Sequence, residues 1–191
     1  MESDRKIMHA IELKNLHFSE EWKEFFWNRF LSLYPKFTDG KGFRTKNVEL
    51  TEKERFMAGP IAEYLKTKVM VVFILGQESV PIHADGVGSD VAIQIPFIGC
   101  NEETQTHFYD YDDGTSIELA IHENVASREV LHQEKLKRVQ TYSMLQNPVL
   151  FRSGWAHDVT STSKDIRVIY SWRFKEKYTW EDTKEICKQY I

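Results

Sequence analysis

The strongest constraint on this 191-residue chain is a histidine and an aspartate placed two positions apart, His83 and Asp85. They follow the apolar run 69–75, which is typical of a buried β-strand. Successive side chains of a strand point to opposite faces, so we expect both residues to leave the same face and to bind one metal ion. Because Asp85 and Gly86 also form a common turn dipeptide, the pair alone leaves a purely structural role open.

The best candidate for the third ligand is His157, which stands just past the strand-like residues 148–151. Two histidines and one carboxylate on one face, with open coordination positions opposite, suit non-haem Fe(II) and oxygen chemistry. Ten positions further on, Arg167 begins a run that is also typical of a strand, residues 167–174. Alternation places four side chains of this run on one face: Arg167, Ile169, Ser171 and Arg173.

This layout resembles the Fe(II)- and 2-oxoglutarate-dependent dioxygenases. Their pattern is His-x-Asp, a long interval, a distal His and, about ten residues later, an Arg or Lys. The likeness extends over residues 69–174 and includes strand-like segments at 91–98 and 104–109. It implies a mainly β fold with flanking α-helices, namely a double-stranded β-helix of the jelly-roll or cupin-like type.

The resemblance also implies a role for each candidate residue. His83, Asp85 and His157 would hold Fe(II) and leave room for 2-oxoglutarate and O2. Arg167 would bind the distal carboxylate of 2-oxoglutarate, because a guanidinium can donate two parallel hydrogen bonds to it. Further contacts to the co-substrate are expected from Ser171, Gln94 and Tyr109, with Arg173 as the substitute for Arg167. Trp155 either lines the substrate entrance or packs a turn.

The implied activity is a hydroxylation or related oxidation, coupled to conversion of 2-oxoglutarate into succinate and carbon dioxide. The substrate would be a small molecule or a side chain, which the sequence does not define. Two alternatives stay open. One is a cupin-type metalloenzyme that does not use 2-oxoglutarate, in which Arg167 would be dispensable. The other is a non-catalytic β-barrel module that binds a peptide or a sugar.

Charge and cysteine content narrow the range of partners and compartments. A net charge of −4 and a pI near 6.0 argue against a large nucleic-acid footprint. Two distant cysteines, Cys100 and Cys187, do not form a disulfide framework or a zinc-ligand spacing. No apolar run approaches the roughly 20 residues that span a bilayer. We therefore expect a cytoplasmic protein without a membrane segment, and nothing in the sequence defines its oligomeric state.

The chain reads as one domain: a helix-rich bracing segment (1–68), the β-helix core (69–175) and a C-terminal helix (176–191). A helix over 19–33 carries an aromatic stripe and begins at Ser19. Thr51 and Glu54 stand in capping-box register for a second helix, which Gly59 and Pro60 should break. We expect an early strand near residues 7–13, and Thr179 as the N-cap of the last helix.

Between the expected strands the sequence predicts two further elements. Residues 116–121 read as a strand bounded by turn residues. Residues 126–140 are highly charged and predict a helix, which would be either part of a lid over the metal or a solvated surface helix.

Overall fold

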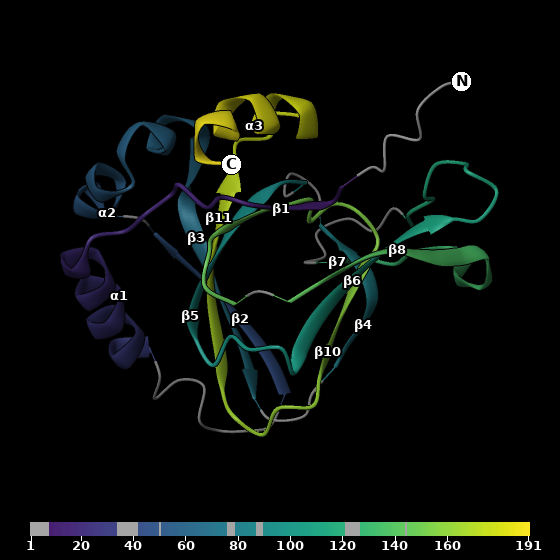
Figure 1. The fold of residues 1–191 in the computed structure, drawn as a ribbon, viewed down its shortest axis with the longest axis horizontal. Helices are drawn as coiled ribbons and strands as arrows, with labels where there is room; N and C mark the ends of the chain where they lie inside the picture. The colour runs from purple at the N-terminus through teal and green to yellow at the C-terminus, as the bar shows by residue number, and fades with distance from the viewer. Residues whose placement is uncertain are drawn as a thin grey trace.

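In this computed structural model the described residues are 8–33, 42–49, 51–75, 79–86, 90–120, 127–143 and 145–191. They form two antiparallel β-sheets that face each other and enclose the centre of the molecule, with helices on the outside of one sheet and at one end (Figure 1).

The first sheet has six strands in the order β1-β9-β5-β11-β3-β2. Its strands are β1 (Ala10–Glu12), β9 (Val149–Phe151), β5 (Ala92–Ile98), β11 (Arg167–Phe174), β3 (Leu65–Leu75) and β2 (Gly42–Glu49). The second sheet has five strands in the order β7-β4-β10-β6-β8. Its strands are β7 (Ser127–Arg128), β4 (Val80–Asp85), β10 (His157–Ser161), β6 (Thr104–Tyr111) and β8 (Leu136–Tyr142).

Two runs of four consecutive strands alternate between the two sheets. β3, β4, β5 and β6 lie in the first, second, first and second sheet, and β8, β9, β10 and β11 repeat the alternation in the opposite order. Two such runs wound together make a double-stranded β-helix, or jelly roll. The expected fold class is therefore confirmed.

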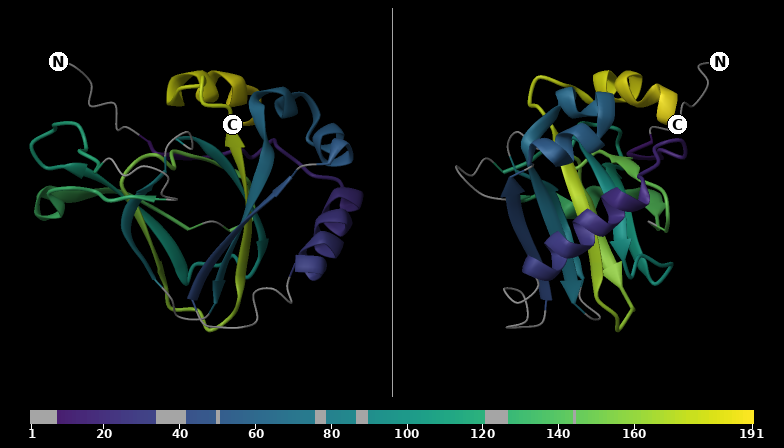
Figure 2. Two further views of the ribbon diagram at one scale, coloured as in Figure 1. Left: turned by 180° about the vertical axis from the view of Figure 1, so that it is seen from behind. Right: turned by 90° about the vertical axis from the view of Figure 1, so that its left-hand side faces the viewer.

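Helix α1 (Glu20–Leu33) covers the outer face of the first sheet (Figure 2). The Trp22 ring stacks on Phe26 at 4.0 Å, and Phe26 meets the edge of Tyr170 of β11 at 4.3 Å. The amide of Trp22 donates to the Ser19 hydroxyl, which caps the helix as expected. Residues of α1 and the outward side chains of β11 thus share the larger hydrophobic core.

Two capping boxes define the other helices. Thr51 and Glu54 bond reciprocally at the start of α2 (Glu52–Met57), and Thr179 and Asp182 do so at the start of α3 (Trp180–Cys187). Gly59 has a φ of +65°, which breaks α2 at the expected place and leads into the 3₁₀ helix η2 (Gly59–Tyr64). A 3₁₀ turn, η4 (Lys188–Tyr190), follows α3.

The helix expected over 126–140 is wrong. The described part of this range, from residue 127, contains β7, a short 3₁₀ turn η3 (Gln133–Lys135) and most of β8. His132 adopts a left-handed conformation with φ of 50°, which a continuous helix cannot contain. The strand expected over 116–121 is reduced to an isolated bridge between Leu119 and Val130, and residue 121 lies outside the described part.

All eight residues of β11 are buried, because each face of this strand is covered. Its even-numbered side chains pack toward α1, while Ile169 joins an apolar cluster between the sheets with Phe108, Val149 and Phe151. Two arginines, Arg167 and Arg173, belong to the same inward series by alternation. The space between the sheets is thus apolar at its centre and charged along one strand.

Among the described residues, none of the helices is long and apolar enough to cross a bilayer. Cys100 and Cys187 are both free thiols.

We predict that Phe26→Ala lowers the free energy of unfolding by about 3–5 kcal/mol, because it leaves a cavity among packed aromatic rings. Phe56→Ala is the matched control, since that ring is 87% exposed and its loss should cost less than about 0.5 kcal/mol. Urea unfolding of the three proteins measures both values. Equal stability of the two variants would show that α1 does not pack on the sheet as described.

Candidate metal centre

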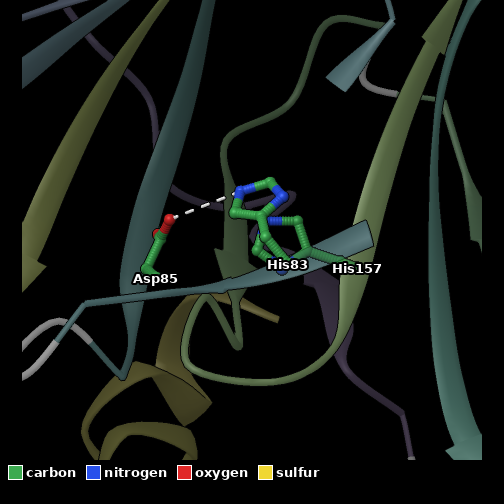
Figure 3. Close-up of side chains that lie close together, drawn as sticks. All are labelled: His83, Asp85 and His157. Carbon is green, nitrogen blue, oxygen red and sulfur yellow. Dashed lines mark ion pairs between the residues drawn. The ribbon is translucent and has the colours of Figure 1, made fainter. Parts of the chain in front are cut away.

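Three side chains gather at one end of the second sheet: His83 and Asp85 from β4, and His157 from the first position of β10 (Figure 3). The two strands pair antiparallel, and His83 lies directly opposite His157. The two ring centroids are 4.4 Å apart. One nitrogen or oxygen atom from each of the three residues lies within 4.8 Å of the other two. This arrangement brings the three predicted ligands together.

Both imidazoles are fixed by backbone carbonyl groups. The Nδ1–H of His83 donates to the carbonyl of Pro81 at 2.8 Å, and the Nδ1–H of His157 donates to the carbonyl of Trp155 at 2.7 Å. A carbonyl can only accept, so Nδ1 must carry the proton in each neutral ring. Nε2 of both rings then has a free lone pair, as a metal ligand requires.

The carboxylate of Asp85 is held by Arg173. The guanidinium of Arg173 donates to Oδ2 at 2.5 Å, and both side chains are largely buried. The second oxygen, Oδ1, lies 3.8 Å from Nε2 of His83 (Figure 3). Arg173 thus occupies one oxygen of Asp85 and leaves the other directed toward the histidines.

The electrostatics of the site favour neutral imidazole beside ionised carboxylate. Burial, together with the neighbouring His83, lowers the pKa of His157 to about 4, so its ring is neutral near pH 7. Burial raises the pKa of the Asp85 carboxyl, but Arg173 and the two imidazoles outweigh it, and the pKa lies below its usual value. Neutral histidine nitrogens and one carboxylate are the donors that the facial arrangement needs.

The turn before His157 is tied to the end of β4. The Nε–H of Arg128 donates to the carbonyl of Asp85 at 2.8 Å, and its Nη2 donates to the carbonyl of Gly154 at 3.3 Å. Gly154 donates its amide to the carbonyl of Asp90, and a Cβ at Gly154 would collide with Asp90. Only glycine therefore allows the turn to approach this closely.

A stack of rings supports the same turn from behind. His9 lies between Trp155 and Phe108, with ring centroids at 5.4 and 5.3 Å, and Phe108 in turn lies near His157. The indole Nε1–H of Trp155 donates to Oδ1 of Asp110 at 2.8 Å. The position of Trp155, whose carbonyl orients His157, is therefore set from both sides.

Arg167 points into the interior and is only 3% exposed. Its Nε is buried without a hydrogen-bond partner, and within the described part of the chain no carboxylate lies at ion-pair distance from it. Burial lowers the pKa of Arg167, and its polar neighbours Cys100 and Tyr142 partly offset this. A buried cation without a counter-ion is costly, so the site is suited to an anion from outside.

Two of the other predicted co-substrate residues lie on the same inner side, and one does not. Ser171 and Gln94 are opposite each other in the pairing of β11 with β5, and the Ser171 hydroxyl is buried without a partner. Tyr109 instead donates to Oδ2 of Asp158 at 2.8 Å and packs in a separate apolar cluster with Val130 and Ala156. Its expected orientation toward the co-substrate is therefore wrong.

Sequence reasoning missed several residues that complete the site: His9, Cys100, Arg128, Tyr142 and the contact of Arg173 with Asp85. Only Arg173 carried a signal, because alternation placed it on the inward face of its strand. The others come from distant segments with no local pattern.

Solved structures share this architecture. A Pseudomonas putida prolyl-4-hydroxylase matches with a TM-score of 0.54 and 10% identity, over 89% of this chain and 94% of that one. The epimerase SnoN, in complex with Fe3+, alpha ketoglutarate and nogalamycin RO, matches with a TM-score of 0.58 and 8% identity, over 87% and 78%. The fold is the one these enzymes use. Neither a protein-family model nor the sequence of a curated protein matches this chain.

We predict that His9 makes the protein less stable in mild acid. Burial lowers the pKa of folded His9 to about 4 from an ordinary value near 6.5, so the unfolded chain binds more protons between these values. The free energy of unfolding that depends on neutral His9 is fully present above about pH 6.5. It decreases as the pH falls toward 4, by about 2 kcal/mol at pH 5.

Urea unfolding at pH 7 and pH 5 measures this loss. His9→Asn should remove that part of the pH dependence, and the matched variant of an exposed histidine, His132→Asn, should retain it. Identical pH dependence in the wild type and His9→Asn would contradict the prediction.

Proposed function

We propose that this protein is an Fe(II)- and 2-oxoglutarate-dependent oxygenase, and that it hydroxylates or otherwise oxidises a small molecule or a side chain. The observation that carries the proposal is Arg167, a buried guanidinium without a carboxylate partner among the described residues. It lies on the same inward face of β11 as Arg173, which holds the metal-ligand candidate Asp85. β11 thus carries the anion site at Arg167 and contacts the candidate metal site through Arg173, an arrangement that suits a keto diacid that binds both.

The residues present fit an iron ion. His83 and His157 would bind it through Nε2, since carbonyl groups occupy Nδ1 of both rings. Asp85 would bind through Oδ1 alone, because Arg173 holds Oδ2. Three ligands on one side of the ion leave positions for a bidentate keto acid and for oxygen. When bound, the iron and the keto acid supply the oxygen activation, and the protein supplies binding and orientation.

The inward side chains of β11 would position the co-substrate. Arg167 would receive its distal carboxylate through paired hydrogen bonds. The Ser171 hydroxyl and the Gln94 amide lie between the levels of Arg167 and Arg173, where they would contact the chain of the diacid. Tyr142 and Cys100, which neighbour Arg167, replace Tyr109 as candidates for the second contact to the carboxylate.

The likeness to SnoN is consistent with this proposal, because that structure contains Fe3+ and alpha ketoglutarate. The three candidate ligands also lie on two neighbouring strands, β4 and β10, with their ligand atoms within 4.8 Å of one another, which supports a single metal site.

We predict that purified protein binds one Fe(II) under anaerobic conditions and forms succinate from 2-oxoglutarate once oxygen and ascorbate are added. His83→Ala, Asp85→Ala and His157→Ala should each abolish both properties. Arg173→Gln should weaken iron binding by roughly 10–100-fold, as loss of a group that orients a ligand does. Iron content and succinate are measured for each, with circular dichroism to verify folding.

His132→Ala removes an exposed histidine and serves as the control, with both properties unchanged. Iron binding that persists in all three ligand variants would refute the site.

We predict that Arg167→Gln raises the dissociation constant for 2-oxoglutarate by at least about thirtyfold, because losing one partner of a buried charge pair costs roughly 2–5 kcal/mol. Iron affinity should not change. The wild type should strongly prefer 2-oxoglutarate over 2-oxoglutaramate, in which an amide replaces the distal carboxylate, and Arg167→Gln should lose most of that preference. Calorimetric titration of the anaerobic iron protein measures all four affinities.

Arg55→Gln, a substitution of an exposed arginine, is the matched control. Iron binding without succinate formation, together with no effect of Arg167→Gln, would instead favour the cupin-type metalloenzyme.

A further inference from the structure

A cavity of about 330 Å³ lies near the start of α3. Its walls include the turn before His157 and the segment after β11, and its size is at the lower end of the roughly 300–1,000 Å³ that small-molecule sites occupy. Polar and aromatic side chains both line it: Asp90, Arg128, Arg152, Trp155, Glu176 and Trp180.

Of the four charged residues among these, three already have partners. Arg128 donates to Asp90 at 3.1 Å, and Glu176 pairs with Lys66 at 2.5 Å. Arg152 has no hydrogen bond or ion pair from its guanidinium to any described residue. The N–H groups of Arg152 are therefore unpaired among the described residues, although the carboxylates of Asp110, Glu181 and Asp90 partly offset its charge.

The guanidinium of Arg152 is nevertheless well positioned. Its central carbon lies 3.9 Å from the centre of the Trp155 ring, so the planar group stacks on the indole. Stacking uses the face of the guanidinium and leaves its N–H edge for an acceptor. Trp155 is itself fixed by Asp110 and by the stacked ring of His9. Arg152 thus rests on a rigid support and is not a freely moving surface side chain.

Two residues that line the cavity are bonded to the proposed reaction centre. Trp155 stands two residues before His157 and orients that ring through its carbonyl group. Arg128 lines the cavity and donates to the carbonyl of Asp85. A molecule in the cavity would therefore contact the turn that precedes His157 and the Arg128 side chain that is bonded to Asp85, although none of the three proposed ligands lines the cavity.

We propose that this cavity binds a small organic anion with an apolar or aromatic body, and that Arg152 binds its carboxylate or phosphate group. The indole rings of Trp155 and Trp180 would contact the body of the ligand. Such an anion is the substrate class of the enzyme, an assignment that rests on the function proposed above.

Binding is tested first, without added iron or 2-oxoglutarate, so that it does not depend on the catalytic proposal. Phenylacetate, phenyl phosphate and the neutral phenylacetamide are titrated into ¹⁵N-labelled protein. The indole N–H signals of Trp155 and Trp180 are followed by NMR, after assignment with Trp155→Phe and Trp180→Phe. The two acids distinguish a carboxylate from a phosphate ligand, and the amide has the shape of phenylacetate without its charge.

At least one acid should shift both indole signals in a saturable manner. The amide should bind with at least about tenfold lower affinity. Arg152→Gln should lower the binding affinity for the acid by a similar factor, and the control Arg55→Gln should leave this affinity unchanged. Equal binding of acid and amide, or unchanged affinity in Arg152→Gln, would overturn the anion site.

Succinate formation then tests the substrate assignment. The acid that binds should increase the rate in the wild type and not in Arg152→Gln. A rate that no anion alters would overturn the substrate assignment. Absence of any succinate would count against the oxygenase function itself, while the binding result would stand separately.

Discussion

The antiparallel pairing of β4 with β10 is the interaction on which the proposed metal centre depends. It places His83 opposite His157, and the pleat of β4 then brings Asp85 to the same face. A slip of one residue would turn these side chains to the other face of the sheet. The pairing of β10 with β6 on its other edge, and the bonds that Arg128 makes to the carbonyl groups of Asp85 and Gly154, both oppose such a slip.

Strand β11 combines stability with binding. Its outward side chains pack with α1 in the larger core, while its inward side chains carry two guanidinium groups into the space between the sheets. Burying a cation is unfavourable unless an anion or a set of hydrogen bonds compensates it. Arg173 is compensated by Asp85. No carboxylate of the described chain compensates Arg167. We interpret its buried charge as a feature that lowers the stability of the free protein and serves to bind an anionic ligand.

Local patterns predicted much of the fold. Alternation of side chains gave the bounds of β11, and both capping boxes stand where Thr51 and Thr179 indicated. The long-range order of His83, Asp85 and His157 was enough to predict that they meet, although their role as ligands stays a prediction.

The errors arose where distant segments decide the structure. Lys137 and its neighbours read as a helix by composition, but pairing with β6 makes them a strand. Tyr109 follows a register shift after Phe108, and a sequence pattern contains no signal for such an irregularity. His9 contacts Trp155 from 146 positions away along the chain, so no local window could have connected them.

The two arginines of β11 have a further consequence, because the strand between them is hydrogen-bonded to a neighbour on each side, β3 and β5. Pairing on both sides fixes the backbone positions from which Arg167 and Arg173 extend, although each pairing contains one register shift. Within the proposed function, the same strand would therefore hold the group that receives the distal carboxylate and the group that orients the ligand Asp85.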